Sequence, residues 1–211
     1  PGPFLAAPSA VGLLVERRST GERGGVAKLF LDAQQLVVLA DSIRATQRAC
    51  LDLARTRSDR EIVDRFGKLL DSAAACELYH WRSEPRGRLA EVVVLDQFSR
   101  HIYRERPGAF ANDALALGLA QEAVSAGADR RLSTQERTFL YMPYMHSESP
   151  AIHTEAVELF SANGVQDNLD FEQRHKAIID RCGRYPHRNA ILGRPSTEEE
   201  LQFLLQPGSH F

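Results

Sequence analysis

Apolar residues recur every three or four positions in this chain from Val26 onward, and no other feature constrains its fold as strongly. That interval keeps side chains on one face of an α-helix, whereas a half-buried strand needs strict alternation. The pattern predicts helices within residues 26–54, 58–73, 89–98, 111–125, 133–143, 150–160, 171–182 and 196–205. Segment 89–98 is apolar on nearly every side, which is typical of a buried central helix. No alternating segments with hairpin turns occur, so the sequence predicts an all-α protein.

The same pattern predicts a simple domain organisation. Residues 1–25 are rich in Pro, Gly, Ser and Ala, and we expect them to form an extended or poorly ordered arm. Residues 26–211 are expected to form one domain, a multi-helix antiparallel array with short loops. A hydrophobic content of 43% is sufficient for a core in a domain of this size.

Local signals mark two helix starts and one helix end. Ser133 with Glu136, and Ser196 with Glu199, have the spacing of a capping box, in which two side chains bond to otherwise unpaired backbone N–H groups. Pro143 supplies no backbone N–H, so it is expected to kink or end its helix.

Composition excludes several functional classes. The 26 Lys+Arg and 28 Asp+Glu leave a net charge of −2, which argues against a dedicated nucleic-acid-binding protein. No apolar run approaches the roughly 20 residues of a membrane span, so no membrane partner is expected. Cys50, Cys76 and Cys182 are odd in number and lack redox or metal spacing, which favours a reducing, cytoplasmic location.

Familiar cofactor motifs are absent from the sequence. It contains no HExxH, CxxC or HxH pattern, no Walker loop, and no GxGxxG or GxSxG motif. We therefore predict neither a cofactor nor a metal. A metal site could arise only from residues that the fold brings together.

Opposite charges interrupt the most apolar helix. Asp96 and Arg100 are four residues apart, on the same side as Leu89. Burying either charge alone would cost several kcal/mol, on the order of the penalty for an unpaired interior ion. They are therefore expected to pair with each other or with charges from another helix, and Gln97 and Arg104 extend this polar strip. Two interpretations stay open: an ion pair that fixes helix register, or part of a ligand site.

Two further polar positions lie beside apolar segments. His146 and Glu148 follow the proline kink, where they could act as a base and its orienting group, or belong to a capping turn. His175 lies in an apolar stripe, where a hydrogen-bonded core histidine is the commoner outcome than a ligand.

A strongly basic stretch follows. Residues 174–194 contain six basic side chains and a single acid, Asp180. The loop within it carries Arg184, His187, Arg188 and Asn189, and Pro186 is placed to begin a helix. A helix N-terminus with guanidinium groups is a good anion receptor. The alternative is a solvated basic turn that pairs with acids elsewhere.

Three ordered motifs, 95–100, 139–148 and 183–194, resemble a bacterial family catalogued only as a domain of unknown function, number nine-two-four. The match runs from about Thr56 to Phe211. It implies a helical fold similar to tetratricopeptide domains, and it implies no activity. Ser99 and His101 depart from the family wording, which usually has Pro and Asn at these positions.

We expect the motifs to form one concave polar site. The leading hypothesis is a module that binds an anionic small molecule or the acidic end of a peptide. Its expected ligand-binding residues are Gln97, Arg100, Arg104, His175, Arg184, His187, Arg188 and Asn189. The second hypothesis is a small hydrolase-like enzyme in which His146 is the general base, oriented by Glu148 or Asp96. A third is a purely structural or partner-binding helical domain.

Overall fold

The computed structural model describes residues 55–209, and every regular element in that range is a helix. The predicted all-α fold is therefore confirmed. The arm expected at 1–25 and the helix or helices expected within 26–54 lie outside the described residues. The described residues belong to one compact unit.

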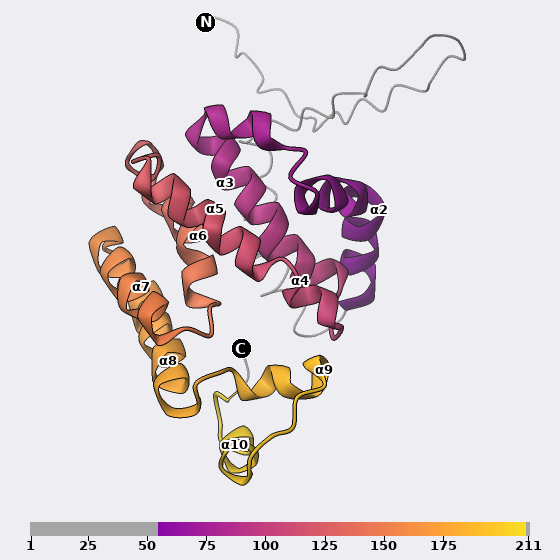
Figure 1. Cartoon of the computed structure of the whole chain (residues 1–211), viewed down its shortest axis with the longest axis vertical. Coiled ribbons are helices and arrows are strands. Elements are labelled where there is room, and N and C mark those ends of the chain that lie inside the picture. Colours follow the sequence, from indigo (N-terminus) through magenta and orange to yellow (C-terminus); the bar gives the residue numbers. More distant parts are fainter. Residues whose placement is uncertain (1–54, 210–211) are drawn as a thin grey trace, which may run out of the picture. The chain divides into compact units, whose positions relative to one another are not determined.

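The helices form an antiparallel array in which α5, α6, α7 and α8 run back and forth, each packed against the next (Figure 1). The α-helices are α2 (Arg55–Ala74), α3 (Pro85–Val93), α4 (Ser99–Ile102), α5 (Asp113–Ser125), α6 (Thr134–Met145), α7 (Pro150–Asn163), α8 (Gln166–Cys182), α9 (Asn189–Leu192) and α10 (Glu198–Leu204). Short 3₁₀ or π turns between them are η1 (Tyr79–Ser83), η2 (Val94–Phe98), η3 (Pro107–Phe110), η4 (Asp129–Arg131) and η5 (Pro186–Arg188). No described helix is both long and apolar enough to cross a membrane.

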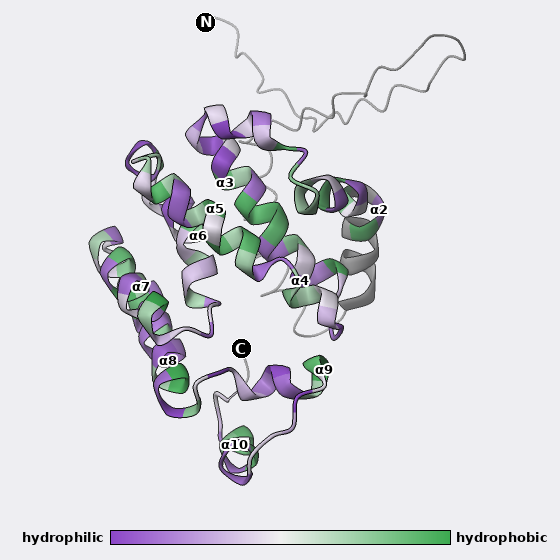
Figure 2. Ribbon diagram, viewed as in Figure 1, coloured by the Kyte–Doolittle hydropathy of each residue, from purple (hydrophilic) through white to green (hydrophobic). Residues whose placement is uncertain are grey.

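The centre of the core is formed by α3 and the η2 turn that continues it, as predicted for the apolar segment 89–98. Leu89, Val92, Leu95 and Phe98 are completely buried. The helix packs against α5 and α6, and the η2 turn that continues it packs against α2 (Figure 2). A helix surrounded on all sides has little room for polar side chains, and from Leu89 to Leu95 only Glu91 is polar; its buried carboxylate is paired with Arg82.

The path from α3 to α4 is almost straight, but it widens at η2 into one π-helical turn. Asp96 and Gln97 lie in this turn. The Ser99 hydroxyl donates to the Leu95 carbonyl (2.6 Å), and Arg100 Nη1 donates to the Asp96 carbonyl (2.8 Å). Side chains therefore supply hydrogen bonds to two backbone carbonyl groups of the widened segment. Single π turns inside helices often coincide with functional sites.

Helix boundaries differ from the predicted ones by several residues in places: α3 begins at Pro85 rather than at 89, and α8 begins at Gln166 rather than at 171. The capping box of Ser133 and Glu136 is present at the start of α6, which passes through Pro143 and ends two residues later at Met145. The capping box predicted for Ser196 and Glu199 is wrong by one residue, because Thr197 and Glu200 form it instead.

One buried polar pair joins α7 to α8. His153 and Glu172 are both fully buried, and His153 Nδ1 lies 2.7 Å from Glu172 Oε1. His153 Nε2 donates to the Ser147 carbonyl (2.8 Å). The pair therefore connects the last two helices of the array to the loop that follows α6.

Candidate functional site

The three sequence motifs converge around two adjoining cavities. One, of about 500 Å³, lies between α4, α6, α8 and η5; we call it the polar lobe, because Gln97, Arg104, His175 and His187 line it. The other, of about 390 Å³, lies between η3, α5, the end of α6 and α9; we call it the apolar lobe. Both volumes are typical of small-molecule sites. Phe110, His146 and Arg188 line both lobes and so form the boundary between them.

Asp96 lies behind this boundary and organises it. Its side chain is almost completely buried, with Oδ1 lying 2.7 Å from His146 Nδ1 and 3.0 Å from Arg100 Nη1. Gln97 Nε2 donates to Oδ2. Burial opposes ionisation of Asp96, but attraction to Arg100 and the contact with His146 outweigh it and lower its pKa. The expected pairing of Asp96 and Arg100 is confirmed, and His146 joins it from another helix.

His146 is held as a neutral imidazole. Burial, and then repulsion from Arg100, lower its pKa below the ordinary value of 6.5, against attraction from Asp96. Because Nδ1 faces an ionised carboxylate, it carries the ring proton. Among residues 55–209, Nε2 has no hydrogen-bond partner, and the imidazole lines both lobes. His146 can therefore accept a proton or a hydrogen bond from a molecule in the cavity.

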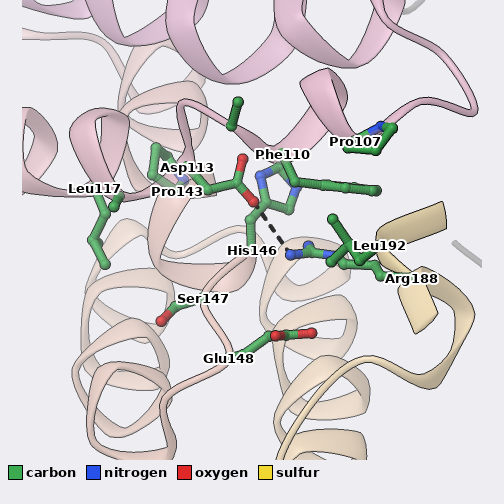
Figure 3. A pocket seen from close by; sticks show the side chains of 12 residues that line it. Pro107, Phe110, Asp113, Leu117, Pro143, His146, Ser147, Glu148, Arg188 and Leu192 are labelled. Atoms are coloured by element: carbon green, nitrogen blue, oxygen red, sulfur yellow. Dashed lines mark hydrogen bonds and ion pairs between the residues drawn. The ribbon is translucent and has the colours of Figure 1, made fainter. Parts of the chain in front are cut away.

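Asp113, which no sequence pattern distinguished, links the two arginines of the site. It receives two hydrogen bonds from Arg100 (2.9 and 3.0 Å) and one from Arg188 Nη1 (3.2 Å). Figure 3 shows the last of these beside His146. Asp113 lies in the first turn of α5, where an acidic residue is common because it complements the helix dipole, so nothing distinguished it.

Arg188 lies between two aromatic rings. Its guanidinium carbon is 4.6 Å from the centre of the Phe110 ring and 4.5 Å from that of Tyr185, and the residue is only 6% exposed. Burial, and then repulsion from Arg100, lower its pKa. Its Nε is buried without a hydrogen-bond partner in the described part of the chain. Phe110 and Tyr185 were missed because a single aromatic residue in a helical sequence ordinarily signals core packing.

Six of the eight predicted ligand residues line the polar lobe: Gln97, Arg100, Arg104, His175, His187 and Arg188. His175 is also the hydrogen-bonded core histidine expected as the commoner outcome, since its Nδ1 donates to the Phe171 carbonyl (2.8 Å). Burial lowers its pKa to about 3, so it contributes no positive charge to the lobe.

Two predicted ligand residues, Arg184 and Asn189, lie outside both lobes. Arg184 donates twice to Glu200 (2.6 and 2.9 Å), and Asn189 bonds Ser196 and Glu200. Neither residue lines either lobe. Both instead fasten the basic loop to the start of α10, as the alternative interpretation of a basic turn paired with acids proposed.

Glu148 also has a different role from the one expected. It receives two hydrogen bonds from Arg194 (2.6 and 2.9 Å) and one from the Tyr185 backbone N–H (2.8 Å). It lines the apolar lobe, but the carboxylate that orients His146 is Asp96. Its hydrogen bonds with Arg194 and Tyr185 outweigh the effect of burial and keep its pKa below the ordinary value.

The helix start expected near Pro186 is too short to bind an anion by itself. Pro186 begins the three-residue η5 turn, and α9 has four residues. So few aligned peptide units sum to a small dipole. Any anion here would depend on the Arg188 side chain. Among the described residues, no group of three or more His, Cys, Asp and Glu side chains could hold a metal ion.

Comparisons with known proteins agree with the fold. A family model described as a bacterial protein of unknown function (DUF924) matches residues 45–208, a range that includes every residue of both lobes. Among solved structures, the protein of unknown function ATU0120 from Agrobacterium tumefaciens is similar, with a TM-score of 0.69 and 34% sequence identity. That match covers 82% of this chain and 99% of the other. No curated protein matches the chain.

Proposed function

This chain belongs to the bacterial DUF924 family, and from that starting point we propose that its two-lobed cavity binds a small anionic molecule through Arg188. The observation that carries the proposal is the state of the Arg188 guanidinium. It is buried at the boundary of both lobes, it makes one hydrogen bond of 3.2 Å to Asp113, and its Nε has no partner among residues 55–209. A buried donor without a partner is unfavourable by about 1–3 kcal/mol, so an incoming acceptor relieves a cost that is already present.

Arg188 differs in this respect from its neighbour. Arg100 already contacts two carboxylates, with two hydrogen bonds to Asp113 and an ion pair with Asp96. Arg188 contacts one carboxylate, Asp113, through a single hydrogen bond. The two aromatic rings over Arg188 hold its planar group in one orientation, which reduces the entropy lost when a carboxylate or phosphate binds it.

Replacing Arg188 with methionine should weaken binding of acetate and inorganic phosphate at least tenfold, since hydrogen bonds to charged groups contribute about 1.5–3 kcal/mol. Protein-observed NMR titration measures affinities in the millimolar range expected for such small anions. Folding should survive the change, because Asp113 keeps both hydrogen bonds from Arg100.

Arg181→Met is the matched control for this measurement. Arg181 also lies over an aromatic ring, 5.6 Å from the centre of Phe203, and also pairs with one carboxylate, Glu199, but it is on the surface. Its replacement should leave both affinities unchanged. Equal affinities in the parent chain and in Arg188→Met would refute the proposal.

A second candidate function is supported by the pair formed by Asp96 and His146. A buried carboxylate on Nδ1, a neutral imidazole and an Nε2 facing a cavity are the requirements of a general base. Arg188 lies beside the same cavity and could stabilise negative charge that develops on a substrate. This arrangement supports a hydrolase-like reaction in which a water molecule is the nucleophile.

His146→Gln tests this candidate with a panel of aryl esters, aryl phosphates and anilides. Any hydrolysis catalysed by the parent chain should fall about 100-fold or more, in keeping with the usual contribution of a general base. Because the base must be neutral and the pKa of His146 is lowered, the rate should stay constant through neutral pH and decline only in acid, with a midpoint below 6.5. His80→Gln, an exposed histidine outside both lobes, is the control. A rate that survives His146→Gln excludes this role.

A further inference from the structure

The apolar lobe is lined mostly by apolar side chains. Besides Phe110, these are contributed by η3, α5, α6 and α9 and by the residue between η3 and α5: Pro107, Ala111, Ala114, Leu117, Pro143 and Leu192. Asp113, His146 and Arg188 lie close together among them (Figure 3). Pockets that bind small molecules combine mostly apolar walls with a few convergent polar groups, and this lobe has that character.

Most polar groups of the lobe are already occupied. The Glu148 carboxylate is held by Arg194, and both Asp113 oxygens accept hydrogen bonds from arginines. Ser147 Oγ accepts from the Ser149 backbone N–H (3.2 Å). Among the described residues that line this lobe, the nitrogen atoms without a hydrogen-bond partner include Arg188 Nε and His146 Nε2, and both residues lie at the boundary with the polar lobe. Away from that boundary, a molecule in the apolar lobe would contact mainly the carbon atoms of apolar side chains.

We infer that the ligand is an amphiphilic acid, with an acidic head at Arg188 and a hydrocarbon portion in the apolar lobe. This inference deepens the proposed anion-binding function and rests on it. The exposed positions of Ala111 and Ala114 support it, because their methyl groups face a cavity that nothing in the described chain fills. Each methylene moved from water into such a lobe should tighten binding about fourfold.

A series of linear alkanoates, from acetate to octanoate, tests the inference on the full chain by NMR titration. Affinity should rise about fourfold per methylene until the chain outgrows the lobe. Hexan-1-ol should bind at least tenfold more weakly than hexanoate, because it cannot form the charged contact with Arg188.

Ala114→Phe locates the hydrocarbon portion. The phenylalanine ring should fill the lobe and abolish the gain in affinity with chain length. Ala126→Phe, at an exposed alanine that follows α5 and lines neither lobe, should leave the full gain. Thermal unfolding of both variants checks that each is folded.

The outcomes separate this inference from the function on which it rests. If acetate binding depends on Arg188 but hexanoate binds no better, the anion site stands and the amphiphilic ligand is wrong. If the gain with chain length survives in Ala114→Phe, or if hexan-1-ol matches hexanoate, the inference is likewise overturned. If acetate and phosphate are both indifferent to Arg188→Met, the proposed function itself fails.

Discussion

Replacing Asp96 with alanine is expected to lower the free energy of unfolding by about 3–5 kcal/mol, the usual result of removing one partner from a buried ion pair. The Asp96 carboxylate is 1% exposed and has both Arg100 and His146 as partners. Without it, Arg100 keeps Asp113, but His146 loses its only hydrogen-bond partner among the described residues. Urea unfolding followed by circular dichroism measures the loss.

The size of this effect should depend on pH in a defined direction. Because the pKa of Asp96 is lowered by folding, its stabilisation is fully present above the unfolded value of 3.8 and is lost as the pH falls toward the folded value. The difference between the parent chain and Asp96→Ala should therefore be largest at neutral pH and shrink in acid.

Asp180→Ala is the control for Asp96→Ala. Asp180 makes an ion pair with Lys176 four residues earlier on α8, as Asp96 does with Arg100 four residues later, but its side chain is half exposed. Solvent screens such a pair, so its loss should change stability by less than about 1 kcal/mol. Similar effects of the two replacements would mean that burial of Asp96 contributes nothing.

The helical array could be predicted because packing and local sequence agree. From Leu89 to Leu95 every residue except Glu91 is apolar, so only a central place in the bundle suits this segment. Predictions fail where two local patterns are equally good. The spacing of a capping box fits both Ser196 with Glu199 and Thr197 with Glu200. Arg184, which lies 16 residues before Glu200, binds Glu200 and so favours the second pair.

Only part of the candidate site could be predicted from the sequence. Asp96 stood out because a charged group on an apolar segment needs a partner, and His146 stood out because it follows the proline kink. The fold brings the two side chains into contact. Arg184 and Asn189 were grouped with Arg188 because they are close in sequence. In a tight turn, however, neighbouring side chains leave the backbone in different directions, and these two point toward Glu200.

The largest remaining effect concerns the fully buried pair of His153 and Glu172. Replacing Glu172 with alanine should lower the free energy of unfolding by about 3 kcal/mol or more, because it leaves an unpaired polar group on His153 and a cavity. Glu172→Gln, in contrast, should be close to the parent chain at neutral pH. Urea unfolding of the two variants measures both effects.

The two replacements should differ because the hydrogen bonds of His153 require a proton on the side chain of residue 172. The Ser147 carbonyl can only accept, so His153 Nε2 donates to it. With that proton on Nε2, a neutral ring accepts at Nδ1, and Glu172 must then carry a proton on Oε1. Burial raises the pKa of Glu172, and its Oε2 has no hydrogen-bond partner among residues 55–209, which a carboxylate would tolerate poorly. The side chain amide of glutamine supplies an N–H in the same place.

The pH dependence distinguishes this protonated pair from an ion pair. Because the pKa of Glu172 is raised by folding, its contribution is fully present below the unfolded value of 4.5 and declines as the pH rises through the folded value. Glu172→Gln does not titrate, so it should gain stability relative to the parent chain as the pH rises. If Glu172→Gln is instead as unstable as Glu172→Ala at neutral pH, the pair is charged, and a buried ion pair lies beside Tyr185, whose ring contacts Arg188.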